Sequence, residues 1–218
     1  MCIRLFRYFA ICALCLTTHF ASASIVYNTL SPVDSEAIGF GWFAGNPGNG
    51  ANYITADEFV PSQSGFISRA YAPVWYVEGV AAPLQFQIRS DISNGPGAVL
   101  DTSVVDPLVP GGLLTAEFLN GLWLEAGTKY WFSIATTDAS TMLIWNINSQ
   151  GLRGAHSSTG ALFQGPGEWL TQADADLGAL RIDVRDPATV PEPSVIWLAL
   201  ISLALSNRLI RRRNGTDA

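Results

Sequence analysis

Cysteine is scarce in this sequence and is confined to its beginning. The three cysteines are Cys2, Cys12 and Cys15, and none occurs after them. A body without thiols cannot be held by disulfides, bind a metal through thiolates or use a cysteine nucleophile. Its stability must therefore come from a packed core.

Basic side chains are also few in the long middle part of the chain. Residues 24–189 contain six Lys and Arg against sixteen Asp and Glu, which gives a net charge near −10. Such an acidic surface repels phosphate backbones and anionic lipids. The composition therefore argues against nucleic acid as a partner.

Histidine is nearly absent, because His156 is the only one that follows His19. One histidine without cysteine cannot form a structural zinc site. The sequence also lacks the G-x-S-x-G elbow that would present a nucleophilic serine. We expect His156 to be a surface residue in a polar loop.

The N-terminal segment has the three parts of a secretory signal peptide. Arg4 and Arg7 precede a short apolar stretch, and Ala21 and Ala23 then occupy the −3 and −1 positions of a signal peptidase site. We expect residues 1–23 to be removed on export. The alternative, a first transmembrane helix, needs ~20 apolar residues, more than this stretch provides.

Apolar and polar residues alternate in several segments of the body. The clearest are "LQFQIRS" (84–90), "KYWFSIA" (129–135), "LIWNI" (143–147) and "LRIDVR" (180–185). A period of two predicts strands with one buried face. Many short strands separated by turns predict an all-β fold, an antiparallel β-sandwich or jelly roll, over residues 24–189.

Turn residues subdivide this predicted domain. Asn94-Gly95 and Gly127 predict turns, and "YITADEFVPSQSGFISRAY" predicts two strands around a turn from Pro61 to Gly65. Residues 40–52 are rich in glycine and asparagine and predict a loop. No repeat or internal linker marks a second domain.

The C-terminal segment joins an apolar run to a basic cluster. The run begins at Val195, and Arg211, Arg212 and Arg213 follow it. Counted through to Ile210, it would span ~24 Å as a helix, somewhat less than a ~30 Å hydrocarbon core. We expect a short transmembrane helix whose arginines stay in the cytoplasm; a buried helix and an ordinary tail anchor are the alternatives.

A Pro-Glu-Pro motif precedes this run, formed by Val190, Pro191, Glu192 and Pro193. The order of motif, apolar helix and arginines over residues 190–213 resembles the PEP-CTERM sorting signal. The resemblance implies an exported protein of a Gram-negative bacterium, held in the inner membrane by its tail until an exosortase, a membrane-embedded cysteine transpeptidase, processes it near the motif. It further implies delivery to the cell surface or biofilm matrix of cells that make exopolysaccharide.

The two prolines suit such recognition, because they keep the backbone extended and remove two amide donors. An extended, unpaired segment is a form that a peptidase cleft can bind. More loosely, "ADEFV" (56–60), "IRSDISNGPGAVL" (88–100) and "LEAGTKYWFSI" (124–134) resemble choice-of-anchor β-sandwich domains, which bring no established catalytic residues.

Aromatic and acidic side chains are the remaining candidates for a ligand site. Trp131 points by alternation away from its apolar neighbours, so it could stack on a sugar together with Trp42 or pack beneath a loop. Asp174 and Asp176 are two residues apart before a glycine, and they could hold Ca²⁺ or form a solvated turn.

We therefore expect a non-enzymatic surface or matrix protein that needs no cofactor. Its expected partners are signal peptidase, an exosortase and, through the transient anchor, the membrane. The first alternative is a carbohydrate-binding module for exopolysaccharide. The second is a secreted glycan hydrolase, for which Glu117, Glu125 and Glu168 are available carboxylates.

Overall fold

The apolar members of the alternating segments form the core of the computed structural model. Leu84, Phe86, Ile88 and Ile182 are fully buried, and Val184 is almost completely buried. The structure describes residues 23–35, 40–46, 53–106, 110–138, 140–160 and 168–185. These belong to one compact unit, Ala23–Asp186. The prediction of an all-β fold from period-two alternation is confirmed.

Thirteen strands and one short 3₁₀ helix make up the described residues. They are β1 (Ala23–Asn28), η1 (Pro32–Ser35), β2 (Gly41–Gly45), β3 (Thr55–Phe59), β4 (Gly65–Glu78), β5 (Leu84–Ile92), β6 (Gly95–Val105), β7 (Gly111–Glu117), β8 (Trp123–Leu124), β9 (Tyr130–Thr136), β10 (Met142–Asn146), β11 (Arg153–Ser158), β12 (Leu170–Asp176) and β13 (Arg181–Arg185). No helix in these residues is long and apolar enough to cross a membrane.

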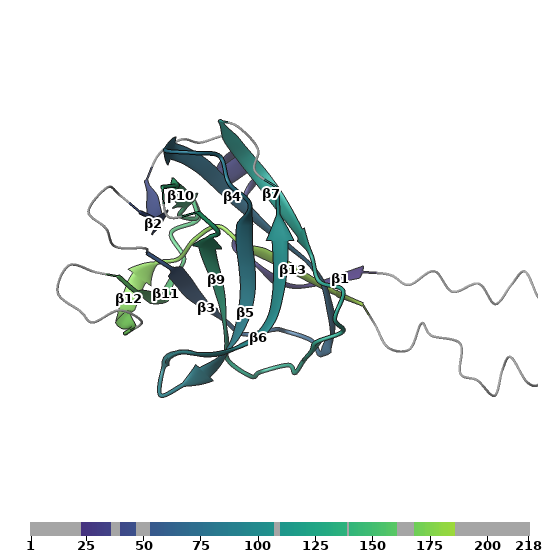
Figure 1. Ribbon diagram of the computed structural model, residues 1–218. Helices are drawn as coiled ribbons and strands as arrows, with labels where there is room; N and C mark the ends of the chain where they lie inside the picture. Colours follow the sequence, from purple (N-terminus) through teal and green to yellow (C-terminus); the bar gives the residue numbers. More distant parts are fainter. Residues whose placement is uncertain are drawn as a thin grey trace, which may run out of the picture. The chain divides into compact units, whose positions relative to one another are not determined.

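The strands form two antiparallel sheets (Figure 1). The first has the order β1-β13-β4-β10-β2, and the long strand β4 also pairs with β7 and β8. The second has the order β12-β11-β3-β9-β5-β6. One apolar cluster draws its residues from both sheets, so the fold is a β-sandwich.

Aromatic rings connect the two sheets at the centre of the core. Phe132 on β9 lies edge-on to Phe86 on β5, with 5.3 Å between ring centroids, and edge-on to Trp145 on β10, at 5.5 Å. Trp145 also donates a hydrogen bond from Nε1 to the Ala179 carbonyl at 2.9 Å. Edge-to-face pairs of this kind add to the free energy gained from burial alone.

The predicted turns are present, with one shift along the chain. The β5–β6 hairpin turns at Ser93 and Asn94, which have positive φ angles of 54° and 65°, and Gly95 already belongs to β6. Positive φ at both central residues suits the twist of a hairpin. Gly127 also has positive φ, at 76°, in the turn before β9.

The predicted loop at residues 40–52 is wrong in its first half. Residues 41–45 form strand β2, which pairs with β10, while residues 47–50 and 51–52 lie outside the described residues. Because β2 begins and ends with glycine, its composition is typical of a loop rather than of a strand. A Cβ on Gly41 would overlap the Ile144 side chain, so close packing requires this glycine.

Candidate functional site

Most of the residues predicted to direct export, membrane orientation and sorting lie outside the described part of the structure. These are Ala21, Val190, Pro191, Glu192, Pro193, Arg211, Arg212 and Arg213. Ala23 is described, as the first residue of β1, where it lies opposite Arg185 at the end of β13. The first and last described strands are therefore paired, and the two ends of the body are neighbours (Figure 1).

Trp131 is not the sugar-stacking platform that was one of its two predicted roles. Its side chain is fully buried, and its Nε1 atom donates a hydrogen bond to Asp91 at 2.8 Å. It packs with Ala56, Ala155 and the half-buried Trp169 in a small second cluster. The alternative, that Trp131 packs under covering residues, is correct, because both faces of β9 are buried.

Trp42 does not join Trp131 and instead stacks on His156. The two rings are 3.5 Å apart between centroids and inclined by only 14°. The indole Nε1 donates to the Asp176 carbonyl at 2.8 Å. The expectation of a surface loop for His156 is wrong as well, since His156 lies in β11 and is only 2% exposed.

His156 is paired with a buried carboxylate rather than with a serine. Its Nδ1 atom lies 2.7 Å from Asp57 Oδ1, and the backbone N–H of Gly178 donates to Asp57 Oδ2. Burial raises the pKa of Asp57 above its ordinary value, and the contacts with His156 and Gly178 offset part of that effect. The neighbouring Ser157 hydroxyl contacts Leu170 and Thr171 instead.

Asp174 and Asp176 hold a guanidinium group in this structure. Arg153 Nε lies 2.8 Å from Asp174, and Arg153 Nη1 lies 2.7 Å from Asp176. Within the described ranges, no three acidic, histidine or cysteine side chains gather in a way that could hold a metal ion. The two carboxylates therefore bind the positively charged side chain of Arg153.

The three glutamates considered for hydrolysis lie in separate elements. Glu117 ends β7 and pairs with the exposed Arg69 on β4, at 3.2 Å. Glu125 follows β8 and Glu168 precedes β12. β8 pairs within the first sheet and β12 within the second, so the topology places Glu125 and Glu168 on different sheets.

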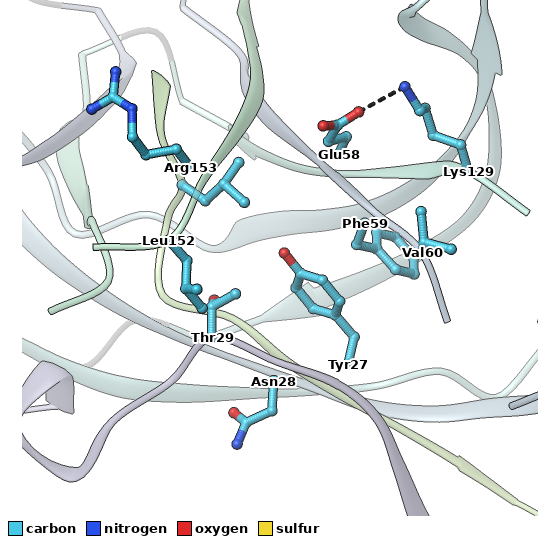
Figure 2. A pocket seen from close by; sticks show the side chains of 10 residues that line it. Tyr27, Asn28, Thr29, Glu58, Phe59, Val60, Lys129, Leu152 and Arg153 are labelled. Carbon is cyan, nitrogen blue, oxygen red and sulfur yellow. Dashed lines mark ion pairs between the residues drawn. The ribbon is translucent and has the colours of Figure 1, made fainter. Parts of the chain in front are cut away.

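A cavity of about 410 Å³ opens where β1, β3 and β11 come together. Its lining is Tyr27, Asn28, Thr29, Glu58, Phe59, Val60, Lys129, Leu152, Arg153 and Leu177 (Figure 2). The volume falls in the ~300–1,000 Å³ range of small-molecule pockets. By surface area most of this lining is apolar, although half of its residues are polar or charged.

An ion pair forms one side of the cavity. Lys129 Nζ lies 2.8 Å from Glu58 Oε2, and the two side chains are 33% and 23% exposed. The other carboxylate oxygen accepts the backbone N–H of Ala155 at 2.8 Å, and Lys129 also donates to Asn94 Oδ1 at 3.3 Å. The bond to Glu58 raises the pKa of Lys129, so Lys129 stays charged at neutral pH.

Tyr27 supplies a hydroxyl and an aromatic surface to the same cavity. Figure 2 shows the hydroxyl pointing into the space between Leu152 and the Glu58–Lys129 pair. Burial raises the pKa of Tyr27, and the nearby carboxylates of Asp57 and Glu58 raise it further, so the hydroxyl keeps its proton. The ring packs on Phe59 with 5.7 Å between centroids.

Phe66 and Trp123 form an exposed aromatic pair elsewhere on the first sheet. The rings meet edge to face at 5.0 Å, and the side chains are 38% and 41% exposed. Their strands place them directly opposite one another on β4 and β8. This pair offers apolar surface but no enclosed cavity.

The sequence did not point to Tyr27, Glu58 or Lys129 as a site. Glu58 stood in the "ADEFV" segment and Lys129, the only lysine in the chain, stood in "GTKYWF". The unusual single lysine was the one local feature that could have drawn attention to the cavity.

Comparison of the chain with models of known families finds no match, and comparison with curated proteins finds none either.

Proposed function

We propose that this chain is an exported, non-enzymatic protein of the cell surface or biofilm matrix, sorted by an exosortase through its C-terminal tail. Signal peptidase removes residues 1–23, and the tail holds the protein in the inner membrane until it is processed near Val190–Pro193. The residue order of that tail, a Pro-Glu-Pro motif, an apolar run and Arg211–Arg213, supports the proposal.

The pairing of the first and last strands is the observation that carries this proposal. Ala23 lies opposite Arg185, and the compact unit ends at Asp186, shortly before the motif. Loss of residues 1–23 and 190–218 would therefore leave every described strand intact except for the first residue of β1. A body built in this way can lose both end segments and stay folded.

The contacts of the reactive side chains support a non-enzymatic role. His156 is buried against Asp57 and Trp42. Glu58 is the only carboxylate among the residues that line the cavity, whereas glycoside hydrolysis requires two carboxylates across the scissile bond. The lining of this cavity therefore lacks the carboxylate pair of a glycoside hydrolase.

The experiment compares processing in cells that contain an exosortase with processing in the same cells without it. The full-length chain carries Pro191→Ala together with Pro193→Ala, and Pro187→Ala is the matched control outside the motif. We expect the double variant to stay full-length in the membrane fraction, as the wild type does without exosortase. A shortened, released product from the double variant would refute the sorting proposal.

A further inference from the structure

We propose that the cavity lined by Tyr27, Glu58 and Lys129 binds a neutral sugar unit. This inference goes beyond the sorting function, because it concerns what the folded body binds after delivery. It rests on the unused hydrogen-bonding capacity of the three polar groups, on the apolar walls and on the local charge balance.

The Tyr27 hydroxyl is the first argument. It faces the cavity (Figure 2), and no hydrogen bond joins it to any residue in the part of the chain that the structure describes. The hydroxyl is therefore free to exchange bound water for the polar groups of a ligand. Since its raised pKa keeps it protonated, it can donate one hydrogen bond and accept another from a ligand.

The Glu58–Lys129 pair is the second argument. An ionised carboxylate has about four acceptor positions and an ammonium has three donors. Glu58 uses two of these positions, on Ala155 and Lys129, and Lys129 uses two donors, on Glu58 and Asn94. The remaining acceptors and donor lie side by side, which matches two neighbouring sugar hydroxyls that each donate and accept.

The apolar walls suit the carbon face of a sugar ring. Phe59, Val60, Leu152 and Leu177 line the cavity beside the Tyr27 ring. Aromatic and aliphatic surface of this kind buries C–H groups while the polar groups fix orientation. A ligand with polar edges and apolar faces therefore satisfies both parts of the lining.

Charge selects a neutral ligand over an anionic one. Lys129 is balanced by Glu58, and Arg153 is balanced by Asp174 and Asp176. Figure 2 shows the Arg153 guanidinium turned away from the Tyr27 hydroxyl. The cavity therefore has no surplus positive charge to offer to a uronic acid or a phosphate.

The single lysine gives a direct measurement of occupancy. Growth on ¹³Cε-labelled lysine labels Lys129 alone in the full-length protein, which is studied in mild detergent, and leaves its three N–H donors intact. The probes are glucose, galactose, mannose, fucose and N-acetylglucosamine, with glucuronate as the anionic comparison. We expect a saturable shift of the Lys129 signal with at least one neutral sugar and a weaker response to glucuronate.

Tyr27→Phe should weaken the binding of the responding sugar about fivefold to tenfold, because one hydrogen bond is lost. Tyr76→Phe, the same change at a hydroxyl outside the cavity, should leave binding unaltered.

A Lys129 signal unmoved by every sugar, equal affinity in Tyr27→Phe, or preference for glucuronate would each overturn the proposal. Binding lost in Trp123→Ala but kept in Tyr27→Phe would also overturn it. Tail processing is scored separately, so failure of the sorting proposal is distinguishable.

Discussion

His156 Nδ1 lies 2.7 Å from Asp57 Oδ1, and each of the two side chains is only 2% exposed. The residues are also directly opposite one another on the paired strands β11 and β3. Gly178 donates to the second carboxylate oxygen and Trp42 covers the imidazole ring. The pair thus joins β3, β11, β2 and the segment between β12 and β13.

Removing one member of this pair should destabilise the fold strongly. His156→Ala leaves the Asp57 carboxylate buried without its main partner, and we expect a loss of about 3–5 kcal/mol in the free energy of unfolding. Urea denaturation followed by far-UV circular dichroism measures it. Glu117→Ala, which breaks the exposed pair with Arg69, is the control and should cause a much smaller change. Equal effects in both variants would contradict a structural role for the buried pair.

Trp131→Ala should act on stability rather than on a ligand. The substitution empties a fully buried site and leaves Asp91 without its indole donor. Large-to-small changes of this kind cost about 3–5 kcal/mol. Trp123→Ala, at a side chain 41% exposed, is the matched control and should shift the urea midpoint far less. A Trp131→Ala protein as stable as the wild type would show that this cluster is not part of the packed fold.

The contrast between these residues shows what sequence alone could predict. Alternation identified the inward faces of β5 and β13, because a period of two fixes which side chains share a face. Alternation does not reveal what covers the opposite face, so the sequence leaves two roles open for Trp131. The second cluster, with Ala56, Ala155 and Trp169, decides between them. The cavity could not be predicted from the sequence for a different reason. Tyr27, Glu58, Lys129 and Leu152 come together only through the pairing of strands distant in sequence, which no local pattern encodes.

Tyr76 should make folding sensitive to alkaline pH. Burial raises the pKa of Tyr76 to about 12 from its ordinary value of 10.0, and its hydroxyl donates to the Ala82 carbonyl at 2.7 Å. Because the folded pKa is the higher one, this contribution to stability is fully present below pH 10 and is lost as the pH rises through about 12. Tyr27 acts in the same direction, so the difference between wild type and Tyr76→Phe isolates Tyr76.

We expect Tyr76→Phe to lose less stability than the wild type across that alkaline range. Absorbance at 295 nm should show one late-titrating phenol fewer in the variant. Identical pH dependence of the unfolding free energy in the two proteins would mean that the Tyr76 hydroxyl is not buried in the folded state.

Gly178 should tolerate no side chain, because a Cβ at this position would overlap the indole ring of Trp145. Trp145 is fully buried and held by its hydrogen bond to Ala179, so it has little room to move. Gly178 also donates to Asp57, and a shift of its backbone would disturb the buried pair as well. We expect Gly178→Ala to cost about 1–3 kcal/mol, as overpacking of a core does.

Gly95→Ala is the matched control for that substitution. Its nearest neighbour to an added Cβ is Thr171 Oγ1 at 3.5 Å, an ordinary contact, and we expect a change of about 0.5 kcal/mol or less. Thermal and urea unfolding of both variants provide the comparison. If Gly178→Ala unfolded at the same midpoint as Gly95→Ala, the close approach of the β12–β13 segment to Trp145 would not exist in solution. The attachment of Asp57 to that segment would then be in doubt as well.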